Sequence, residues 1–275
     1  MKILIADHLH ESAKETLEDI GHEVIVQPDC TTEKLHEYLS EVEALVVRST
    51  KVTRESIQAG ASLELIIRAG AGVDTIDVEA ASRQGIYVCN VPGKNAVAVA
   101  ELTFALLLAI DRRVADGAAD LRNGVWNKKL YSRADGVLGK TIGIVGLGDI
   151  GLSVAERAKA FGMNIVGQRK QGRSETVEQR IRQIGIRLVD TLEELVSQSD
   201  ILTFHLPSNS ETESLINREL LSKCRQGAIL LNTSRGDIVD EKALLEAISE
   251  RGLRVGLDVF RNEPASSENK LEYPP

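Results

Sequence analysis

The sequence has few cysteines and no apolar run long enough to cross a bilayer. Its three cysteines, Cys30, Cys89 and Cys224, lack the spacing of a metal or redox motif, which argues against a disulfide framework and favours reduced thiols. The longest apolar run, from Thr103 to Ile110, is far shorter than the roughly 20 residues of a membrane-spanning helix. We therefore expect a cytoplasmic protein that binds no metal and contacts no membrane.

The sequence also has fewer positive than negative charges. The chain has 33 lysine and arginine residues against 41 aspartate and glutamate residues, and its formal net charge is −8. Nucleic-acid recognition usually needs a basic face, so this balance argues against a nucleic-acid partner. A small anionic substrate stays compatible with it, because binding depends on local charge.

Short apolar runs alternate with amphipathic stretches along the whole chain. The 275 residues, 43% hydrophobic and 27% charged, suit a globular protein of two domains. The alternation predicts an α/β fold of two doubly wound parallel sheets with helices on both faces. The predicted strands are Lys2–Ala6, Glu23–Val26, Ala44–Val47, Leu65–Arg68, Tyr87–Asn90, Thr141–Val145, Asn164–Gly167, Arg187–Val189, Ile201–Phe204, Ala228–Asn232 and Arg254–Val259.

A long helix, predicted from Val97 to Asn123, divides this pattern. Five of the predicted strands precede it and six follow it. We place the domain boundary near Asn95, which gives one domain over residues 1–95 and a second over residues 96–275.

A glycine-rich motif of the G-x-G-x-x-G type follows the predicted strand Thr141–Val145 and opens a helix. In this context the motif predicts a dinucleotide site: one glycine for the tight turn, one for approach of backbone to the pyrophosphate, and one for helix–strand packing. The acidic residue within the loop is expected to point to solvent or to cap the helix, with only its N–H facing the ligand. The predicted cofactor-binding residues of the loop are Gly146, Gly148, Asp149, Ile150 and Gly151.

Basic residues follow the next predicted strand, where an NAD site usually carries an acidic residue. Arg169 and Lys170 stand there, with Arg173 close by. Such a cluster suits a 2′-phosphate and favours NADP(H) over NAD(H). The alternative is a solvated basic loop beside a site that still takes NAD(H).

Several linked motifs together resemble the D-isomer-specific 2-hydroxyacid dehydrogenases, and within them the 3-phosphoglycerate dehydrogenases. The resemblance covers essentially the whole chain. The segments that carry it are Val47–Val52, Arg68–Asp74, Asn90–Gly93, the glycine loop, Asn232–Gly236, and Asp258–Phe260 leading to Glu263 and Pro264.

This resemblance implies the roles of the two domains. Residues 1–95 would form a flavodoxin-like substrate domain, which the C-terminal tail of a complete chain crosses back to finish, and residues 96–275 the Rossmann nucleotide domain. It also implies cofactor contacts at His205, Pro207, Thr212, Thr233, Ser234, Asp258 and, in the first domain, Ala71.

Arg235 and Glu263 each follow a predicted strand and therefore lie just past the carboxyl ends of parallel strands, where open sheets bind ligands. The residues alone allow either a catalytic pair or a surface ion pair. The resemblance implies that Arg235 grips the carboxylate and carbonyl oxygen of a 2-keto acid. It implies that Glu263 holds a histidine protonated, and that this histidine donates the proton as hydride arrives.

That histidine is missing from its expected place. The histidines of the chain are His8, His10, His22 and His36, all in the first domain, and His205, which we expect to be structural. In the family the catalytic histidine follows the Glu-Pro pair, beyond the last residue of this sequence. We therefore expect a truncated sequence, with a natural pseudoenzyme as the alternative. Either one predicts dinucleotide binding with poor turnover.

Substrate contacts are predicted in the first domain. The loop from Gly70 through Gly72 to Val73 is expected to form a backbone nest for the substrate carboxylate, with a simple glycine turn as the alternative. The resemblance adds phosphate-binding and polar contacts at Arg48, Ser49, Lys51 and Asn95.

The resemblance also implies a homodimer. Trp126 to Lys129 is similar to a stretch at the dimer interface of the phosphoglycerate enzymes, and the alternative is a solvated lysine pair beside a packed tryptophan. The long helix is expected at the same interface.

The function implied is an NAD(P)-dependent oxidoreductase acting on 3-phosphoglycerate and 3-phosphohydroxypyruvate, a pair of serine biosynthesis. A glyoxylate or hydroxypyruvate reductase is the alternative within the same class. From another class, a catalytically impaired regulator that binds NAD(P)(H) is also compatible with the absent histidine.

Overall fold

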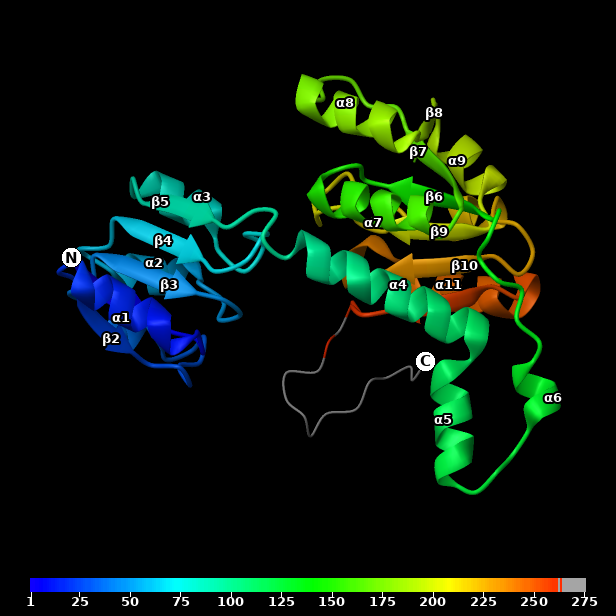
Figure 1. Ribbon diagram of the computed structural model, residues 1–275. Coiled ribbons are helices and arrows are strands. Elements are labelled where there is room, and N and C mark those ends of the chain that lie inside the picture. The colour runs from blue at the N-terminus through cyan, green and yellow to red at the C-terminus, as the bar shows by residue number, and fades with distance from the viewer. Residues whose placement is uncertain (262, 264–275) are drawn as a thin grey trace. The chain divides into compact units, whose positions relative to one another are not determined.

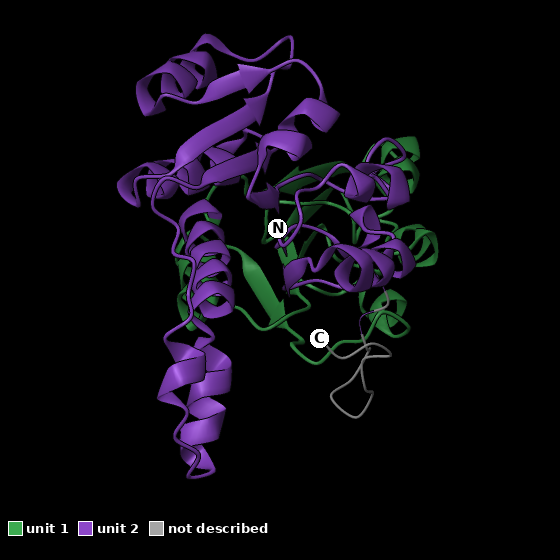
Figure 2. Cartoon of the chain, turned by 90° about the vertical axis from the view of Figure 1, so that its right-hand side faces the viewer, with its two compact units in different colours: residues 1–95 green, residues 96–275 purple. Residues whose placement is uncertain are grey.

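The computed structural model describes residues 1–261 and 263, and the chain divides into two compact units, Met1–Asn95 and Ala96–Pro275. Figure 2 colours the two units separately. Each is an α/β unit built on its own sheet, and each is described here by itself.

Unit 1 is a five-stranded parallel sheet in the order β2-β1-β3-β4-β5, which is the flavodoxin-like order. Leu35, Ile57 and Ala81 pack from helices on one face, and Leu17 of α1 packs on the other. Its elements are β1 (Lys2–Ile5), α1 (Glu11–Asp19), β2 (Glu23–Val26), η1 (Leu35–Tyr38), β3 (Ala44–Val47), α2 (Arg54–Ala59), β4 (Leu65–Arg68), α3 (Val78–Arg83) and β5 (Tyr87–Asn90).

Unit 2 is built on a six-stranded parallel sheet in the order β11-β10-β9-β6-β7-β8, the order of a dinucleotide-binding Rossmann fold. The helices α4, α7 and α8 cover one face, and α9, α10 and α11 cover the other (Figure 1). The strands are β6 (Thr141–Val145), β7 (Asn164–Gln168), β8 (Arg187–Val189), β9 (Ile201–Phe204), β10 (Ile229–Asn232) and β11 (Arg254–Leu257). The helices are α4 (Ala96–Arg112), α5 (Val114–Arg122), α6 (Lys128–Tyr131), α7 (Asp149–Ala160), α8 (Glu175–Ile184), α9 (Leu192–Gln198), α10 (Arg218–Ser222), η2 (Gly236–Ile238) and α11 (Glu241–Arg251).

The predicted fold class is confirmed. Every predicted strand has a counterpart whose ends lie within two residues of the prediction, and all the pairings are parallel. The continuously apolar runs are the central strands: β6, β9 and β10 are buried along almost their whole length. Burial on both faces explains why these runs lack polar alternation.

The single helix predicted from Val97 to Asn123 is wrong, because the chain breaks it at Arg113. This residue adopts the left-handed conformation, with φ 51° and ψ 44°, between α4 and α5. The last turn of α4 is fixed by Asp111, whose buried carboxylate accepts the N–H of Gly136 from the returning chain. The helices α5 and α6 then extend beyond the body of unit 2 and form a projection that we call the arm (residues 114–132; Figures 1 and 2).

Arg113 is the natural place to test this break. A left-handed conformation costs a non-glycine residue about 1 kcal/mol. The change Arg113→Gly is therefore expected to leave the free energy of unfolding unchanged or to raise it by up to about 1 kcal/mol, after the entropy that glycine loses on folding. Ala119→Gly, within α5, is the control and should lower it by about 1 kcal/mol. Urea denaturation measures both, and an equal loss in the two variants would contradict a left-handed Arg113.

Candidate functional site

The glycine loop connects β6 to α7 at the carboxyl edge of the sheet in unit 2. Gly146 has φ +98°, and a Cβ atom there would lie 2.3 Å from the carbonyl oxygen of His205. A Cβ atom on Gly151 would lie 1.9 Å from the carbonyl oxygen of Gly146. Both positions therefore require glycine for reasons internal to the protein, because backbone approaches backbone.

Gly148 is different. Its φ of −86° and ψ of −162° suit any residue, and a Cβ atom there would meet no atom within 4 Å among the described residues. Neither backbone conformation nor packing within the protein requires a glycine at this exposed position. The open space above it fits the approach of a pyrophosphate, which is the requirement that the motif predicts.

The amino terminus of α7 faces the same space. Gly148 is its N-cap and supplies no side-chain cap, and the first hydrogen bond within the helix runs from the N–H of Leu152 to the carbonyl of Gly148. The N–H groups of Asp149, Ile150 and Gly151 therefore have no acceptor within the helix. The side chain of Asp149 is exposed in the first turn. The helix end thus offers N–H groups and its positive dipole end to an anion.

The basic cluster lies at the end of β7. The Nε of Arg169 donates to the carboxylate of Asp190 at 2.9 Å, and both side chains are exposed. Arg173 donates to the carbonyl of Gln168 at 2.6 Å and so supports the turn. Lys170 is exposed. Arg169 is thus placed at the strand end as predicted, with its guanidinium tethered to an acidic neighbour.

His205 follows β9 and is held inside the protein. Its Nε2 lies 3.0 Å from Oγ1 of the buried Thr203, its Nδ1 has no partner among the described residues, and burial lowers the pKa of the imidazole to about 4. It is neutral near pH 7 and is unsuited to donating a proton. Pro207 and Thr212 follow in one turn, in which Oγ1 of Thr212 donates to the carbonyl of Pro207 at 2.6 Å.

Asn232, at the end of β10, organises the loop that carries Arg235. Its buried Oδ1 accepts from both the N–H and the hydroxyl of Ser234, and its Nδ2 donates to the carbonyl of Arg235 at 2.8 Å. The guanidinium of Arg235 donates to the carbonyl of Ser234 at 2.7 Å. The hydroxyl of Thr233 forms a hydrogen bond with the hydroxyl of Thr103 in α4, with 3.2 Å between the two oxygens.

The loops after β10 and β11 are packed against each other. A Cβ atom on Gly236 would lie 2.1 Å from the backbone of Phe260, so only glycine lets them approach this closely. The exposed Glu263 accepts the N–H of Phe260 at 3.0 Å. Asp258 also follows β11, and its N–H donates to the carbonyl of Asn232. Arg235 and Glu263 therefore belong to neighbouring loops, and Pro264 lies outside the described residues.

In unit 1, the backbone of the loop after β3 binds the carboxylate of Asp7, which follows β1. One carboxylate oxygen of Asp7 accepts the N–H groups of Arg48, Ser49 and Thr50 at 2.7, 3.1 and 3.1 Å. The backbone N–H groups of Arg48 and Ser49, two residues of the predicted phosphate-binding segment, are thus already paired. An external phosphate would have to be held by the side chains of Arg48, Ser49 and Lys51, which are exposed.

The loop after β4 has the opposite arrangement. Its carbonyl groups accept hydrogen bonds from the protein itself. The N–H of Val91 donates to the carbonyl of Gly70. The side chain of Asn90 donates to the carbonyl of Ala71, and the guanidinium of Arg68 donates to that of Gly72. Among the described residues, the N–H groups of Ala71, Gly72 and Val73 meet no acceptor. Paired carbonyls and free N–H groups are what a backbone nest for a carboxylate needs. Asn95, the remaining predicted contact, ends unit 1.

Sequence reasoning missed four residues that organise these loops. Asp7, Arg68, Asn232 and Gly236 were assigned no role of their own, although the last three stand inside the quoted motifs. Arg68 joins the two loops of unit 1, because its Nε donates to the carbonyl of Arg48 at 3.1 Å. The available signal was position, since a polar residue at the buried end of a strand has to find a partner in the adjoining loop.

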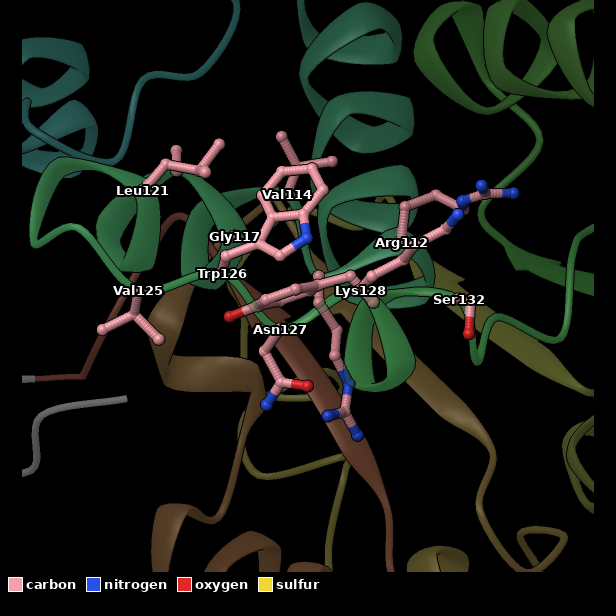
Figure 3. A pocket seen from close by; sticks show the side chains of 12 residues that line it. Arg112, Val114, Gly117, Leu121, Val125, Trp126, Asn127, Lys128 and Ser132 are labelled. Atoms are coloured by element: carbon pink, nitrogen blue, oxygen red, sulfur yellow. The ribbon is translucent and has the colours of Figure 1, made fainter.

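The arm carries an apolar cavity of about 510 Å³ (Figure 3). None of the residues that line it belongs to the glycine loop. The side chains of Val114, Leu121 and Trp126 surround it and are 57, 60 and 77% exposed. Trp126 is therefore not packed within the chain, which removes the alternative of a buried tryptophan. The hydroxyl of Tyr131 donates to Asp120 at 2.6 Å and fastens α6 to α5.

No helix within the described residues is both long and apolar enough to cross a membrane. Over the same residues, histidine, cysteine, aspartate and glutamate side chains form no group that could hold a metal ion.

Comparison with known proteins gives a consistent result. Residues 104–274 match the family described as D-isomer specific 2-hydroxyacid dehydrogenase, NAD binding domain. The chain is 44% identical over 266 residues to D-3-phosphoglycerate dehydrogenase of Methanocaldococcus jannaschii, covering 96% of this chain and 50% of that relative. It is 39% identical over 269 residues to hydroxypyruvate reductase of Thermotoga maritima, covering 97% of this chain and 85% of that relative.

A solved structure gives the same fold. An acyclic imino acid reductase in complex with NADPH and D-arginine superposes with a TM-score of 0.84 at 32% identity, covering 97% of this chain and 85% of that one. The chain spans about half the length of the phosphoglycerate dehydrogenases that it matches.

The half-buried His205 predicts a dependence of stability on pH. Its pKa is about 4 in the folded chain and about 6.5 when unfolded, so the unfolded chain takes up the proton first as the pH falls. The stabilisation is complete above about pH 6.5 and is lost on the way down to about pH 4, with about 2 kcal/mol lost between pH 7 and pH 5. His205→Gln should remove this slope, whereas His8→Gln, at an exposed position, should retain it. Urea unfolding at the two pH values measures it, and equal slopes in both variants would show that His205 does not cause it.

Proposed function

Because the chain belongs to the D-isomer specific 2-hydroxyacid dehydrogenase family, we propose that it binds a nicotinamide dinucleotide and acts on a D-2-hydroxy acid/2-keto acid pair. The observation that carries this proposal is Gly148, a glycine that neither backbone conformation nor packing requires, at the open amino terminus of α7. The space and the unsatisfied N–H groups there fit a pyrophosphate.

The residues that would hold the cofactor line the carboxyl edge of the sheet in unit 2. The loop N–H groups of Gly148, Asp149 and Ile150 bind the phosphates, and Pro207, Thr233 and Ser234 border the same edge after β9 and β10. When bound, a nicotinamide supplies or accepts the hydride. The protein would hold the substrate for that transfer. Because burial lowers the pKa of His205 to about 4, this residue stays neutral near pH 7.

The cofactor is proposed to be NADP(H) in preference to NAD(H). Support comes from Arg169, which stands at the end of β7 in place of an acidic residue, and from Lys170 beside it. The ion pair with Asp190 keeps the guanidinium of Arg169 at the strand end. The imino acid reductase that shares the fold is in complex with NADPH, which agrees with this choice.

Arg235 is proposed to bind the carboxylate and carbonyl oxygen of the 2-keto acid, because a guanidinium matches two oxygens with two parallel N–H groups. Asn232 fixes the loop from which Arg235 projects. Glu263 is proposed to orient the group that protonates the carbonyl oxygen. The nest of Ala71, Gly72 and Val73 offers N–H groups to a substrate carboxylate.

The substrate pair is proposed to be 3-phosphoglycerate and 3-phosphohydroxypyruvate, as in the phosphoglycerate dehydrogenases among the relatives. The exposed side chains of Arg48, Ser49 and Lys51 would hold the phosphate. One observation favours a second candidate, a glyoxylate or hydroxypyruvate reductase: Asp7 occupies the backbone donors of this segment and brings a negative charge to it. The Thermotoga maritima relative is named a hydroxypyruvate reductase.

The assembly is proposed to be a homodimer that pairs through the arm and α4. The exposed apolar side chains of Val114, Leu121 and Trp126 support this, because such a patch is covered in most soluble proteins. A closed twofold contact buries the same face on both copies. Sedimentation velocity of the purified chain measures the assembly directly.

Gly148→Asp separates dinucleotide binding from folding. Aspartate is a favourable N-cap, so the free energy of unfolding should stay the same or rise. The added side chain and charge should weaken dinucleotide binding by at least about tenfold, or about 1.4 kcal/mol. Ser62→Asp adds the same charge at an exposed position of unit 1 and is the control. Calorimetric titration with NADPH and with NADH measures both affinities, and the wild-type chain should bind NADPH more tightly. If the Gly148 variant bound the dinucleotide as tightly as the wild type, the proposed binding site would be wrong.

Lys51→Ala tests the choice between the two substrates. It should lower kcat/KM for 3-phosphohydroxypyruvate by about tenfold, because a charge-assisted contact is lost, and leave that for hydroxypyruvate within about twofold. Lys34→Ala, in the same unit, is the control. A wild-type preference for the unphosphorylated acid would instead assign the reductase.

A further inference from the structure

A polar cavity lies at the edge of the sheet in unit 2 that is opposite to the glycine loop. Its volume is about 430 Å³. It is lined by residues that precede β6 or lie at the amino ends of β9, β10 and β11, by the end of α4, and by the chain that returns from the arm. These are the amino ends of the parallel strands, whereas the glycine loop follows a carboxyl end. The cavity is therefore separate from the proposed dinucleotide seat.

The charge that lines this cavity is opposite in sign to that of the whole chain. Acidic residues outnumber basic ones in the sequence by 41 to 33, but here basic side chains predominate. The basic residues are Arg113, Arg133, Lys140, Arg225 and Arg254, and the acidic residues are Asp111, Asp135 and Asp200.

The carboxylates of all three acidic residues accept hydrogen bonds from N–H groups of the protein. Asp200 accepts the N–H of Thr141 and the guanidinium of Arg225, each at 2.8 Å. Burial would raise the pKa of Asp200, but these two donors outweigh it and lower the pKa, so the group stays ionised. Asp111 is buried against the N–H of Gly136.

The third acidic group, Asp135, accepts from Arg254 at 3.0 Å. Two of the basic residues, Arg225 and Arg254, therefore form ion pairs with acidic groups of the cavity. The hydrogen bonds and ion pairs found among residues 1–261 and 263 include none from the side chains of Arg113, Arg133 or Lys140. Three cations that share one concave space repel one another, and an anion with several charged oxygens removes that repulsion.

We propose that this cavity binds a small polyanion, an organic phosphate or a polycarboxylate, through Arg113, Arg133 and Lys140. The cavity has the volume of a small-molecule site. Arg113 also borders the apolar cavity of the arm, so the bound polyanion lies at the junction of α4 and α5. The inference is independent of hydride transfer and of the glycine loop.

Calorimetric titration of the purified chain with citrate and, separately, with inorganic phosphate at constant ionic strength tests the proposal. We expect saturable binding of at least one probe. The double change Arg133→Ala and Lys140→Ala should weaken it by at least about tenfold, because two charged contacts are lost. Lys242→Ala, an exposed lysine of α11 outside the cavity, is the matched control and should bind as the wild type does.

Binding of one probe alone supports the proposal and identifies the class of ligand. Equal affinity in the double variant and the wild type would place the anion elsewhere, for example at the glycine loop, and overturn the proposal. Absence of saturable binding for both probes overturns it as well. Arg133→Gln, a single change at an exposed position, gives the same comparison if the double variant is unstable.

Discussion

Contact of backbone with backbone, which only glycine permits, determines the carboxyl edge of the six-stranded sheet. Gly146 lies under the carbonyl of His205, Gly151 lies against the carbonyl of Gly146, and Gly236 lies under the backbone of Phe260. These contacts join the loops after β6 and β9 and those after β10 and β11. A methyl group at any of the three would force the loops apart, because backbone cannot move aside as a flexible side chain does.

This edge gives the proposed function its geometry. With the loops held together, the amino terminus of α7 keeps its unsatisfied N–H groups facing open space, and Asn232 holds the turn that carries Arg235. The donors are fixed before any ligand arrives, so binding requires little ordering. Unit 1 follows the same principle, because Asp7 and Arg68 brace loops whose remaining polar groups point outward.

The sequence predicts much of this fold and part of its site. The strands were predictable because parallel strands buried on both faces are short apolar runs between turns, and the glycine loop because its motif lies between a strand and a helix. The break at Arg113 was not predictable, because neither glycine nor proline marks it. The bracing role of Asp7 was also hidden, since the N–H groups that donate to its carboxylate lie 41 to 43 residues further along the chain.

The proposed function requires the dinucleotide to lie over Gly148. Backbone amide NMR of the ¹⁵N-labelled chain, recorded while NADPH is added, tests this most directly because it locates the ligand by residue. We expect the largest shifts, saturable with NADPH, at Gly148, Asp149 and Ile150 at the amino terminus of α7. Shifts that leave these three amides unmoved, or that gather at other loops of the sheet, would contradict it.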